Sequence, residues 1–249
     1  MAKTERKKNR FGLVGKNISY SFSKGYFSKK FKDSGLSDCS YENFDLESIS
    51  MFVDMIDQNQ LKGLNVTIPY KEQVISYLDD LDIQAKTIGA VNTIKFTPKG
   101  LKGFNTDAYG FEESIRPQLK KHHKKALILG TGGASKAVAY VFDALGIDFT
   151  YVSRNPKKNQ FAYHQLKEEI LKEYLVIVNC SPVGTHPKVE EKPDIPYQHI
   201  TSKHLLFDLI YNPEKTTFLK NGEAQGATIL NGLAMLEFQA EKAWEIWNQ

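Results

Sequence analysis

The fold is decided by the stretch Ala126-Leu127-Ile128-Leu129-Gly130-Thr131-Gly132-Gly133-Ala134-Ser135. Its first half is an unbroken apolar run that ends at glycine, which is typical of a buried strand in a parallel sheet. The glycines then permit a tight turn, and residues 135–145 have the apolar spacing of a helix. A strand, a glycine-rich turn and a helix in this order form a dinucleotide-binding fingerprint, because the helix N-terminus offers unpaired N–H groups to phosphates.

This turn supplies the first predicted contacts with a cofactor. Gly130 allows the tight turn, Gly132 lets the backbone approach the pyrophosphate, and Ser135 replaces the glycine or alanine of the usual third position. A glycine turn with a purely structural role is the alternative. The predicted contacts are Gly130, Gly132, Gly133, Ala134 and Ser135.

The next predicted strand, residues 149–152, decides which dinucleotide fits. An NAD site usually has a carboxylate after this strand to bind the ribose 2′-hydroxyl. Here the strand is followed by Ser153, Arg154 and Asn155, with Lys157 and Lys158 close behind. A charged hydrogen bond from arginine to a 2′-phosphate is worth about 1.5–3 kcal/mol, which is roughly a tenfold to hundredfold preference. The sequence therefore predicts NADP rather than NAD, the alternative being a solvated basic loop.

Strands and helices go on alternating up to residue 209. Strands are predicted at residues 175–178 and 205–209, and a helix at residues 163–171. This alternation predicts a parallel sheet covered on both faces. The loop after residue 178 contains Ser181 at the carboxyl end of a central strand, where it either reaches the nicotinamide or forms only a turn.

The residues before and after this alternating region follow other patterns. We expect a strand at residues 11–15, a hairpin from residues 90–96 and 101–105, and helices at residues 26–31, 47–60, 73–81 and 109–119. Residues 232–247 are predicted to form a helix with one apolar side.

A second informative stretch is Asn65-Val66-Thr67-Ile68-Pro69-Tyr70-Lys71. Its β-branched residues favour a strand, so Asn65 and Thr67 share one face. Pro69 suits the first turn of a helix, which predicts Lys71 at a helix N-terminus. The macrodipole there disfavours a cation by roughly 0.3–1 kcal/mol, and a lysine held in such a place is a candidate for proton transfer. The alternative is a surface lysine after an ordinary turn.

The composition argues against several classes of protein. The chain has 249 residues, 41% of them hydrophobic, and no apolar run long enough to span a membrane. The first ten residues contain no secretory signal, and their basic side chains account for the whole formal charge of +4. A neutral body with a solvated tail is therefore predicted, rather than a nucleic-acid-binding protein.

The cysteines and histidines give no sign of a metal site. Cys39 and Cys180 lie far apart without metal-ligand spacing, which favours a reduced cytoplasm. His122 and His123 are adjacent in a charged loop, where solvation is expected instead of metal binding.

The chain also carries a series of short motifs in a fixed order. They are Ser21-Phe22-Ser23, Asn65–Lys71, Gly89–Thr93, Gly103–Asp107, the turn from Gly130, Ser153-Arg154-Asn155, Asn179–Gly184, Asp208–Pro213 and Asn231–Ala240. In this order and spacing they resemble the shikimate dehydrogenase family nearly from end to end. Tyr20 and Lys24 replace the histidine and proline that often flank the family's serine pair, and Ser153-Arg154-Asn155 replaces its usual Asn-Arg-Thr.

The resemblance implies an α/β protein of two domains. Residues 1–107 plus 232–249 would form an open mixed α/β sheet domain that binds substrate. Residues 108–231 would form a Rossmann-like parallel-sheet domain that binds NADP, and both ligands would share the cleft between the domains. The implied activity is the reversible NADPH-dependent reduction of 3-dehydroshikimate to shikimate by hydride transfer at ring C3, in chorismate and aromatic amino-acid biosynthesis.

The resemblance also implies the roles of individual residues. Lys71 is the expected acid–base group, or the cation that stabilises a developing oxyanion, and Asp107 is expected to orient it. Substrate contacts are expected from Ser21, Ser23, Asn65, Thr67, Asn92, Tyr211 and Gln239, and further cofactor contacts from Ser181 and Gly232. For Asn92 and Asp107 the alternative is turn chemistry beside a hairpin, and for Gln239 it is a helix-surface amide.

Two other functions stay open at this point. A quinate/shikimate dehydrogenase would accept a substrate that differs by one ring hydroxyl, or a wider range of cofactors. A catalytically silent NADP-binding regulator would keep the fold without the activity, although Lys71 and Asp107 are both present. A small-molecule substrate is the expected partner, with no nucleic acid or membrane, and the expected assembly is a cytoplasmic monomer or homodimer.

Overall fold

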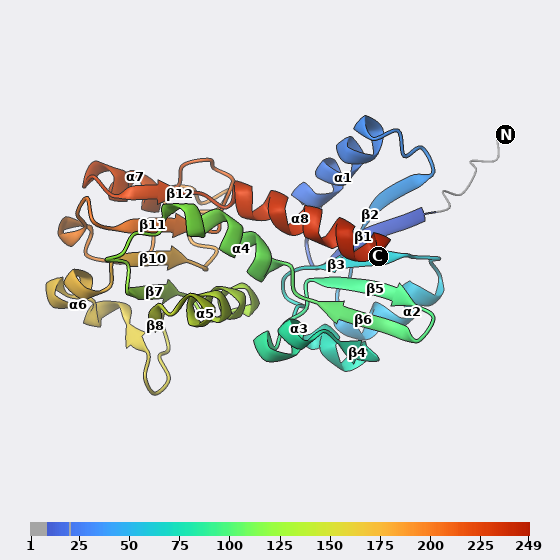
Figure 1. Ribbon diagram of the computed structural model, residues 1–249, viewed down its shortest axis with the longest axis horizontal. Coiled ribbons are helices and arrows are strands. Elements are labelled where there is room, and N and C mark those ends of the chain that lie inside the picture. The colour runs from blue at the N-terminus through green and yellow to red at the C-terminus, as the bar shows by residue number, and fades with distance from the viewer. Residues whose placement is uncertain (1–8, 20) are drawn as a thin grey trace. The chain divides into compact units, whose positions relative to one another are not determined.

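Residues 9–19 and 21–249 are described by the computed structural model, and they form two compact units (Figure 1). The first unit consists of the chain up to Thr106 together with Ala240–Gln249, and the second consists of Asp107–Gln239. Met1–Lys8 of the basic leader and Tyr20 lie outside the described residues. Arg10, which the sequence placed in the solvated leader, instead lies in a strand and pairs with Glu42 at 3.1 Å, because the first strand begins at residue 9.

The sheet of the first unit is mixed, as expected. Its strands are β1 (Asn9–Gly15), β2 (Cys39–Asp45), β3 (Gly63–Val66), β4 (Asp80–Leu81), β5 (Thr93–Thr97) and β6 (Gly100–Phe104). They lie in the order β2-β1-β3-β5-β6-β4, with β1 parallel to β2 and β3, and with β5 antiparallel to β3 and β6. The carboxyl ends of β1, β2 and β3 therefore meet at one edge of the sheet, which gathers the polar side chains that follow these strands.

Alternate residues of β1 separate two apolar cores in this unit. Phe11 and Leu13 pack with Phe27 and Trp247 on one side of the sheet, and Val14 packs with Phe52 on the other. The first core is covered by α1 (Phe22–Asp33) and by the end of α8 (Leu233–Asn248). The second is covered by η1 (Ile49–Met51), α2 (Phe52–Asp57), η2 (Gln73–Tyr77) and α3 (Ile83–Ile88).

The sheet of the second unit is entirely parallel. Its strands are β7 (Lys125–Leu129), β8 (Asp148–Ser153), β9 (Phe161–Ala162), β10 (Val176–Asn179), β11 (Leu205–Asp208) and β12 (Thr228–Leu230). They lie in the order β12-β11-β10-β7-β8-β9, so the direction of winding reverses between β7 and β10. This is the Rossmann order that the glycine turn predicts, and ligands of such sheets bind beside the reversal.

Helices cover both faces of this sheet, as Figure 1 shows. They are α4 (Asp107–Ile115), η3 (Arg116–Gln118), α5 (Gly133–Leu145), η4 (Tyr163–Gln165), α6 (Glu168–Glu173), η5 (Tyr197–His199) and α7 (Thr217–Ala224). On one face Phe111 of α4 lies 5.4 Å from Phe142 of α5 and 5.2 Å from Phe207 of β11, measured between ring centroids. On the other, Leu171 of α6 and Phe218 of α7 pack on alternate residues of the central strands.

Two of the helices expected from apolar spacing are wrong in extent. Residues 73–81 form the short 3-10 helix η2 and then β4, because the backbone pairs with the β6 hairpin from Asp79 onward. Lys71 therefore lies in a turn and not at an α-helix N-terminus, so the macrodipole does not explain its place. Residues 163–171 split into η4 and α6, since Leu166 between them is extended and buried.

The prediction that His123 is solvated is also wrong. The ring is buried, its Nδ1 accepts a hydrogen bond from Lys120 N–H at 3.0 Å, and its Nε2 lies 3.0 Å from the Lys203 carbonyl oxygen. Burial lowers the pKa of His123, which suits a neutral ring that links two loops.

Across residues 9–19 and 21–249, no three His, Cys, Asp or Glu side chains gather as a metal site would require, and no helix is long and apolar enough to cross a membrane.

Gly63 of β3 offers a test of how α8 closes the first core. A Cβ at Gly63 would collide with the indole of Trp247, whose Nε1–H donates to the Ile94 carbonyl oxygen at 3.0 Å. We expect Gly63→Ala to lower the free energy of unfolding by about 1–3 kcal/mol, measured by urea denaturation. Gly25→Ala is the matched control, because Gly25 lies in α1 with open space around it and should gain about 0.5–1 kcal/mol. Equal effects of the two substitutions would contradict this packing.

Candidate functional site

The polar centre of the first unit is Asn65, the third residue of β3. Its side chain is buried, and Nδ2 donates to the Asn92 carbonyl oxygen and to Thr93 Oγ1, each at 3.2 Å. Its Oδ1 accepts a hydrogen bond from the Tyr41 hydroxyl at 2.7 Å. Both ends of the amide are thus satisfied, Oδ1 by a residue of β2 and Nδ2 by residues at the start of β5, as a buried amide requires.

Asn92 extends this network toward the end of the first unit. Its Oδ1 accepts from Thr106 N–H at 2.7 Å, and its Nδ2 donates to Thr106 Oγ1 at 3.0 Å. Asn92 is buried, with its backbone paired to Val66 and Phe104. Its amide therefore fixes the segment that immediately precedes Asp107 in the chain.

The serine pair lies at the start of α1. Ser21 is the N-cap, and its hydroxyl accepts from Ser23 N–H at 3.2 Å. Ser23 is buried, and burial raises the pKa of the Tyr41 hydroxyl, while the Ser23 side chain opposes the rise. Tyr41 therefore connects Ser23 to Asn65, a connection the sequence does not predict, because no pattern identifies β2 as a strand.

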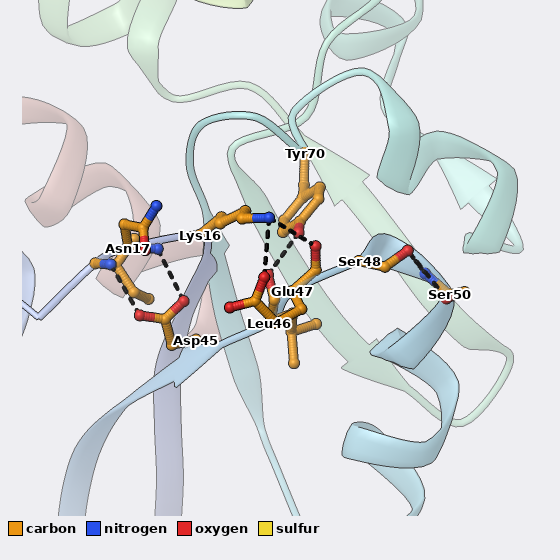
Figure 2. Close-up of polar contacts among 9 residues, drawn as sticks. Lys16, Asn17, Asp45, Leu46, Glu47, Ser48, Ser50 and Tyr70 are labelled. Atoms are coloured by element: carbon orange, nitrogen blue, oxygen red, sulfur yellow. Dashed lines mark hydrogen bonds and ion pairs between the residues drawn. The ribbon is translucent and has the colours of Figure 1, made fainter.

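Thr67 and Lys71 follow β3 in a turn that is held from both sides. Thr67 N–H donates to the Val14 carbonyl oxygen at 2.8 Å, and the Lys71 carbonyl oxygen accepts from Val91 N–H at 2.7 Å. Between them, Tyr70 is buried and its hydroxyl donates to the Leu46 carbonyl oxygen at 2.5 Å, as Figure 2 shows. The backbone around Lys71 is therefore fixed by β1, the β2 end and the segment before β5.

In the second unit, the glycine turn has the geometry that its sequence predicts. Gly130 has a φ of +104°, which favours glycine, and its Cα faces the backbone of Cys180 and Ser181. Gly132 caps α5, and a Cβ built there meets nothing within 4 Å. Ser135, in the unusual third position, turns its hydroxyl back to the Gly132 carbonyl oxygen at 2.7 Å. An open helix N-terminus of this kind fits a dinucleotide phosphate.

The end of β8 carries the basic residues assigned to the 2′-phosphate. Arg154 and Asn155 are exposed, and Asn155 N–H donates to Ser153 Oγ at 3.2 Å. Lys157 and Lys158 are also exposed. These donors fit NADP, because a guanidinium in water keeps its hydrogen-bonding groups available for a phosphate.

A second buried network lies at the carboxyl ends of β10 and β11. Asn179 Oδ1 accepts from the Ser181 hydroxyl at 2.7 Å, and Asn179 Nδ2 donates to Asp208 Oδ1 at 3.0 Å. The other oxygen of Asp208 accepts from Thr216 Oγ1–H at 2.6 Å. Burial raises the pKa of Asp208 to about 6, although these hydrogen bonds oppose the rise. Asp208 thereby orients the loop that contains Ser181.

The remaining predicted site residues lie elsewhere in the second unit. Asp107 is the buried first residue of α4, and Tyr211 is half-buried after β11. Gly232 lies where a Cβ would collide with the Leu209 carbonyl group, so close packing alone requires glycine there. Gln239 is buried in α8, not placed on a helix surface; its Nε2 donates to the Leu236 carbonyl oxygen at 2.9 Å, and its Cβ faces Gly110 of α4.

Comparison with known proteins gives a consistent family. Residues 13–94 match the model of the shikimate dehydrogenase substrate binding domain. A shikimate dehydrogenase (NADP(+)) from Clostridium botulinum is 37% identical over 247 residues, covering 95% of each chain. The crystal structure of shikimate dehydrogenase from Aquifex aeolicus superposes with a TM-score of 0.87 at 32% identity, covering 100% of this chain and 94% of that one. Shikimate 5-dehydrogenase from Thermus thermophilus, in complex with NADP(H) and shikimate, gives 0.84 at 30% identity, with 96% and 93% covered.

Asp208 predicts a measurable pH dependence of stability. Because its pKa is higher in the folded than in the unfolded chain, its contribution is fully present below about pH 4 and is lost as the pH rises through about 6. Relative to wild type, Asp208→Asn should therefore gain stability between pH 4 and pH 7, by roughly 3 kcal/mol in all. Urea denaturation across this range measures the difference, and parallel curves for the two proteins would show that Asp208 is not the titrating group.

Proposed function

Because the chain belongs to the shikimate dehydrogenase family, we propose that it catalyses the reversible NADPH-dependent reduction of 3-dehydroshikimate to shikimate. The observation that carries the proposal is the buried amide and hydroxyl network around Asn65. Such a neutral set of donors and acceptors suits a polyol, and a site built to bond hydroxyls rejects analogues that lack them. The reaction would serve chorismate and aromatic amino-acid biosynthesis.

We propose that the substrate domain comprises residues 1–107 plus 232–249 and the NADP domain residues 108–231. The substrate carboxylate and hydroxyls would be bound by one residue of the NADP domain, Tyr211, and by six of the substrate domain: Ser21, Ser23, Asn65, Thr67, Asn92 and Gln239. The hydrogen bonds of Asn65 with Tyr41 and Thr93 support this assignment, because they hold the Asn65 amide in place before substrate arrives.

We further propose that Lys71 and Asp107 carry the proton transfer. In the direction of reduction, the Lys71 ammonium would donate a proton to the C3 oxygen as the carbonyl becomes an alcohol. In the reverse direction the neutral amine would accept that proton. Asp107 would orient Lys71 and the substrate hydroxyl. The fixed backbone on both sides of Lys71 supports this role, since an acid–base group must be held in register with its substrate.

The cofactor would be held by residues at the carboxyl ends of β7, β8, β10 and β12. They are Gly130, Gly132, Gly133, Ala134 and Ser135 at the phosphates, Ser153, Arg154 and Asn155 at the 2′-phosphate, and Ser181 and Gly232 toward the nicotinamide. Bound NADPH would supply the hydride for C3. The chain's own part is to present the α5 N-terminus and the Arg154 guanidinium to negative charge.

We place the enzyme in the cytoplasm, as a monomer or homodimer with small-molecule partners only. The free thiols of Cys39 and Cys180 support a reducing compartment, because disulfides are rare there. Quinate remains the competing substrate, since a single ring hydroxyl distinguishes it from shikimate.

The direct test uses the purified wild-type chain and follows the formation of NADPH from NADP by absorbance, with shikimate as the substrate. We expect turnover with shikimate and a preference for NADP over NAD of roughly tenfold to hundredfold in kcat/KM. Parallel assays with quinate decide between the two substrates. Tight NADP binding without turnover of either acid would instead identify a catalytically silent regulator.

Lys71→Ala tests the proposed proton transfer. Loss of a positioned acid–base group should lower kcat by about 10²–10⁴-fold, while the dissociation constant for NADP stays within about twofold. Lys86→Ala, which removes an exposed lysine from α3 of the same unit, is the matched control and should behave as wild type. A Lys71→Ala enzyme with nearly normal kcat would refute the assignment.

A further inference from the structure

The loop between β1 and α1 contains a residue in an unusual backbone conformation. Asn17 has a φ of +56°, which L-residues other than glycine seldom adopt. Asparagine adopts this conformation more often than other non-glycine residues, and it persists where the surroundings hold it. The loop leads directly to Ser21 and Ser23, so its course sets where the serine pair begins.

Asp45, the last residue of β2, holds this conformation. Its Oδ1 accepts from Asn17 N–H at 2.8 Å and its Oδ2 accepts from Ile18 N–H at 3.1 Å, so one carboxylate binds two successive backbone groups. Figure 2 shows the carboxylate of Asp45 pointing at Asn17 across the edge of the sheet. The strands bring them together, because Asp45 is paired in register with Gly15 at the end of β1.

Ile18 connects the loop held by Asp45 to the serine pair. Its carbonyl oxygen accepts from Asn43 Nδ2–H and from Ser21 N–H, each at 3.0 Å, and its side chain is buried in the first core. Ser21 then caps α1 through Ser23 N–H. Asp45 and Asn43, both from β2, thus bind the N–H and the carbonyl oxygen of Ile18, and the same carbonyl oxygen accepts from the N–H of the N-cap residue Ser21.

We propose that Asp45 is a positioning residue for substrate binding, acting through the backbone of Asn17 and Ile18 to set the serine pair. This inference rests on the proposed function. In this role Asp45 contacts no substrate atom and takes no part in the proton transfer. Its loss should therefore weaken binding of the substrate and leave the chemical step and the cofactor alone.

The neighbouring carboxylate, Glu47, supplies a matched control. Its carboxylate pairs with Lys16 of the same loop at 2.9 Å, through side chains that are 39% and 80% exposed. The Lys16 ammonium also donates to the Glu47 carbonyl oxygen at 3.2 Å, a bond that Glu47→Gln keeps. An exposed pair of this kind contributes little to structure. Glu47→Gln and Asp45→Asn remove the same charge from almost the same place, and only the second disturbs the loop backbone.

The experiment compares steady-state kinetics of wild type, Asp45→Asn and Glu47→Gln with shikimate and NADP. We expect Asp45→Asn to raise KM for shikimate by about tenfold, consistent with the loss of one charged hydrogen bond. The kcat and the KM for NADP should stay within about threefold, and Glu47→Gln should match wild type.

A second pair of variants changes Asn17, the loop partner of Asp45, and keeps the test informative if Asp45→Asn folds poorly. Asn17→Pro removes the donor and cannot adopt a positive φ, so it should reproduce the rise in KM for shikimate. Asn17→Gly keeps the donor and tolerates the conformation, so it should leave KM unchanged.

Three outcomes would overturn the proposal: equal effects of Asp45→Asn and Glu47→Gln, an equal rise in KM for NADP, or equal effects of the two Asn17 variants. An inactive wild type would instead overturn the proposed function.

Discussion

The first unit depends on a buried amide in the middle of its sheet. Asn65 occupies a strand position that apolar residues usually fill, and its side chain is satisfied by Tyr41 from β2 and by Asn92 and Thr93 from the β5 side. An unpaired amide in such a place would cost several kcal/mol. The neighbouring strands can therefore take only the register that supplies these partners, and the same register brings their polar ends together.

The second unit meets a similar constraint with a carboxylate. Asp208 is buried at the end of β11, where Asn179 and Thr216 donate to its two oxygens. The loops after β10 and β11 are thereby fixed to each other by these hydrogen bonds. In both units, polar side chains at the carboxyl ends of parallel strands order the loops that carry the proposed ligand contacts, and the apolar layers behind them supply the stability.

Local patterns predict much of this arrangement, and long-range pairing explains what they miss. The apolar run before Gly130 and the alternation of Asn65 with Thr67 depend only on neighbours in sequence, so strand β7, its turn and the polar face of β3 follow directly. The strand β2 has no apolar run, since Ser40, Glu42 and Asn43 interrupt it, and it is held by pairing with β1. Tyr41 and Asp45 therefore escape a sequence analysis, as their partners lie more than twenty residues away.

Glycines also differ in whether the local sequence or a long-range contact explains them. Gly130 is recognised by its turn, whereas the reason for Gly232 is the backbone of Leu209, which only the folded chain brings near. The 3-10 helix after Lys71 likewise reflects pairing of Asp79 with the β6 hairpin, which overrides a helical spacing.

Because the chain returns to its first core at its C-terminal end, the order in which the two units can fold during translation is constrained. Ala240, Ala243 and Trp247 complete the layer over Phe11 and Phe27, yet they leave the ribosome after every residue of the second unit. The Rossmann unit is contiguous, so it can fold while translation continues, as domains generally do. Until residues 240–247 have been synthesised, the apolar surface around Phe11 and Phe27 therefore stays incomplete.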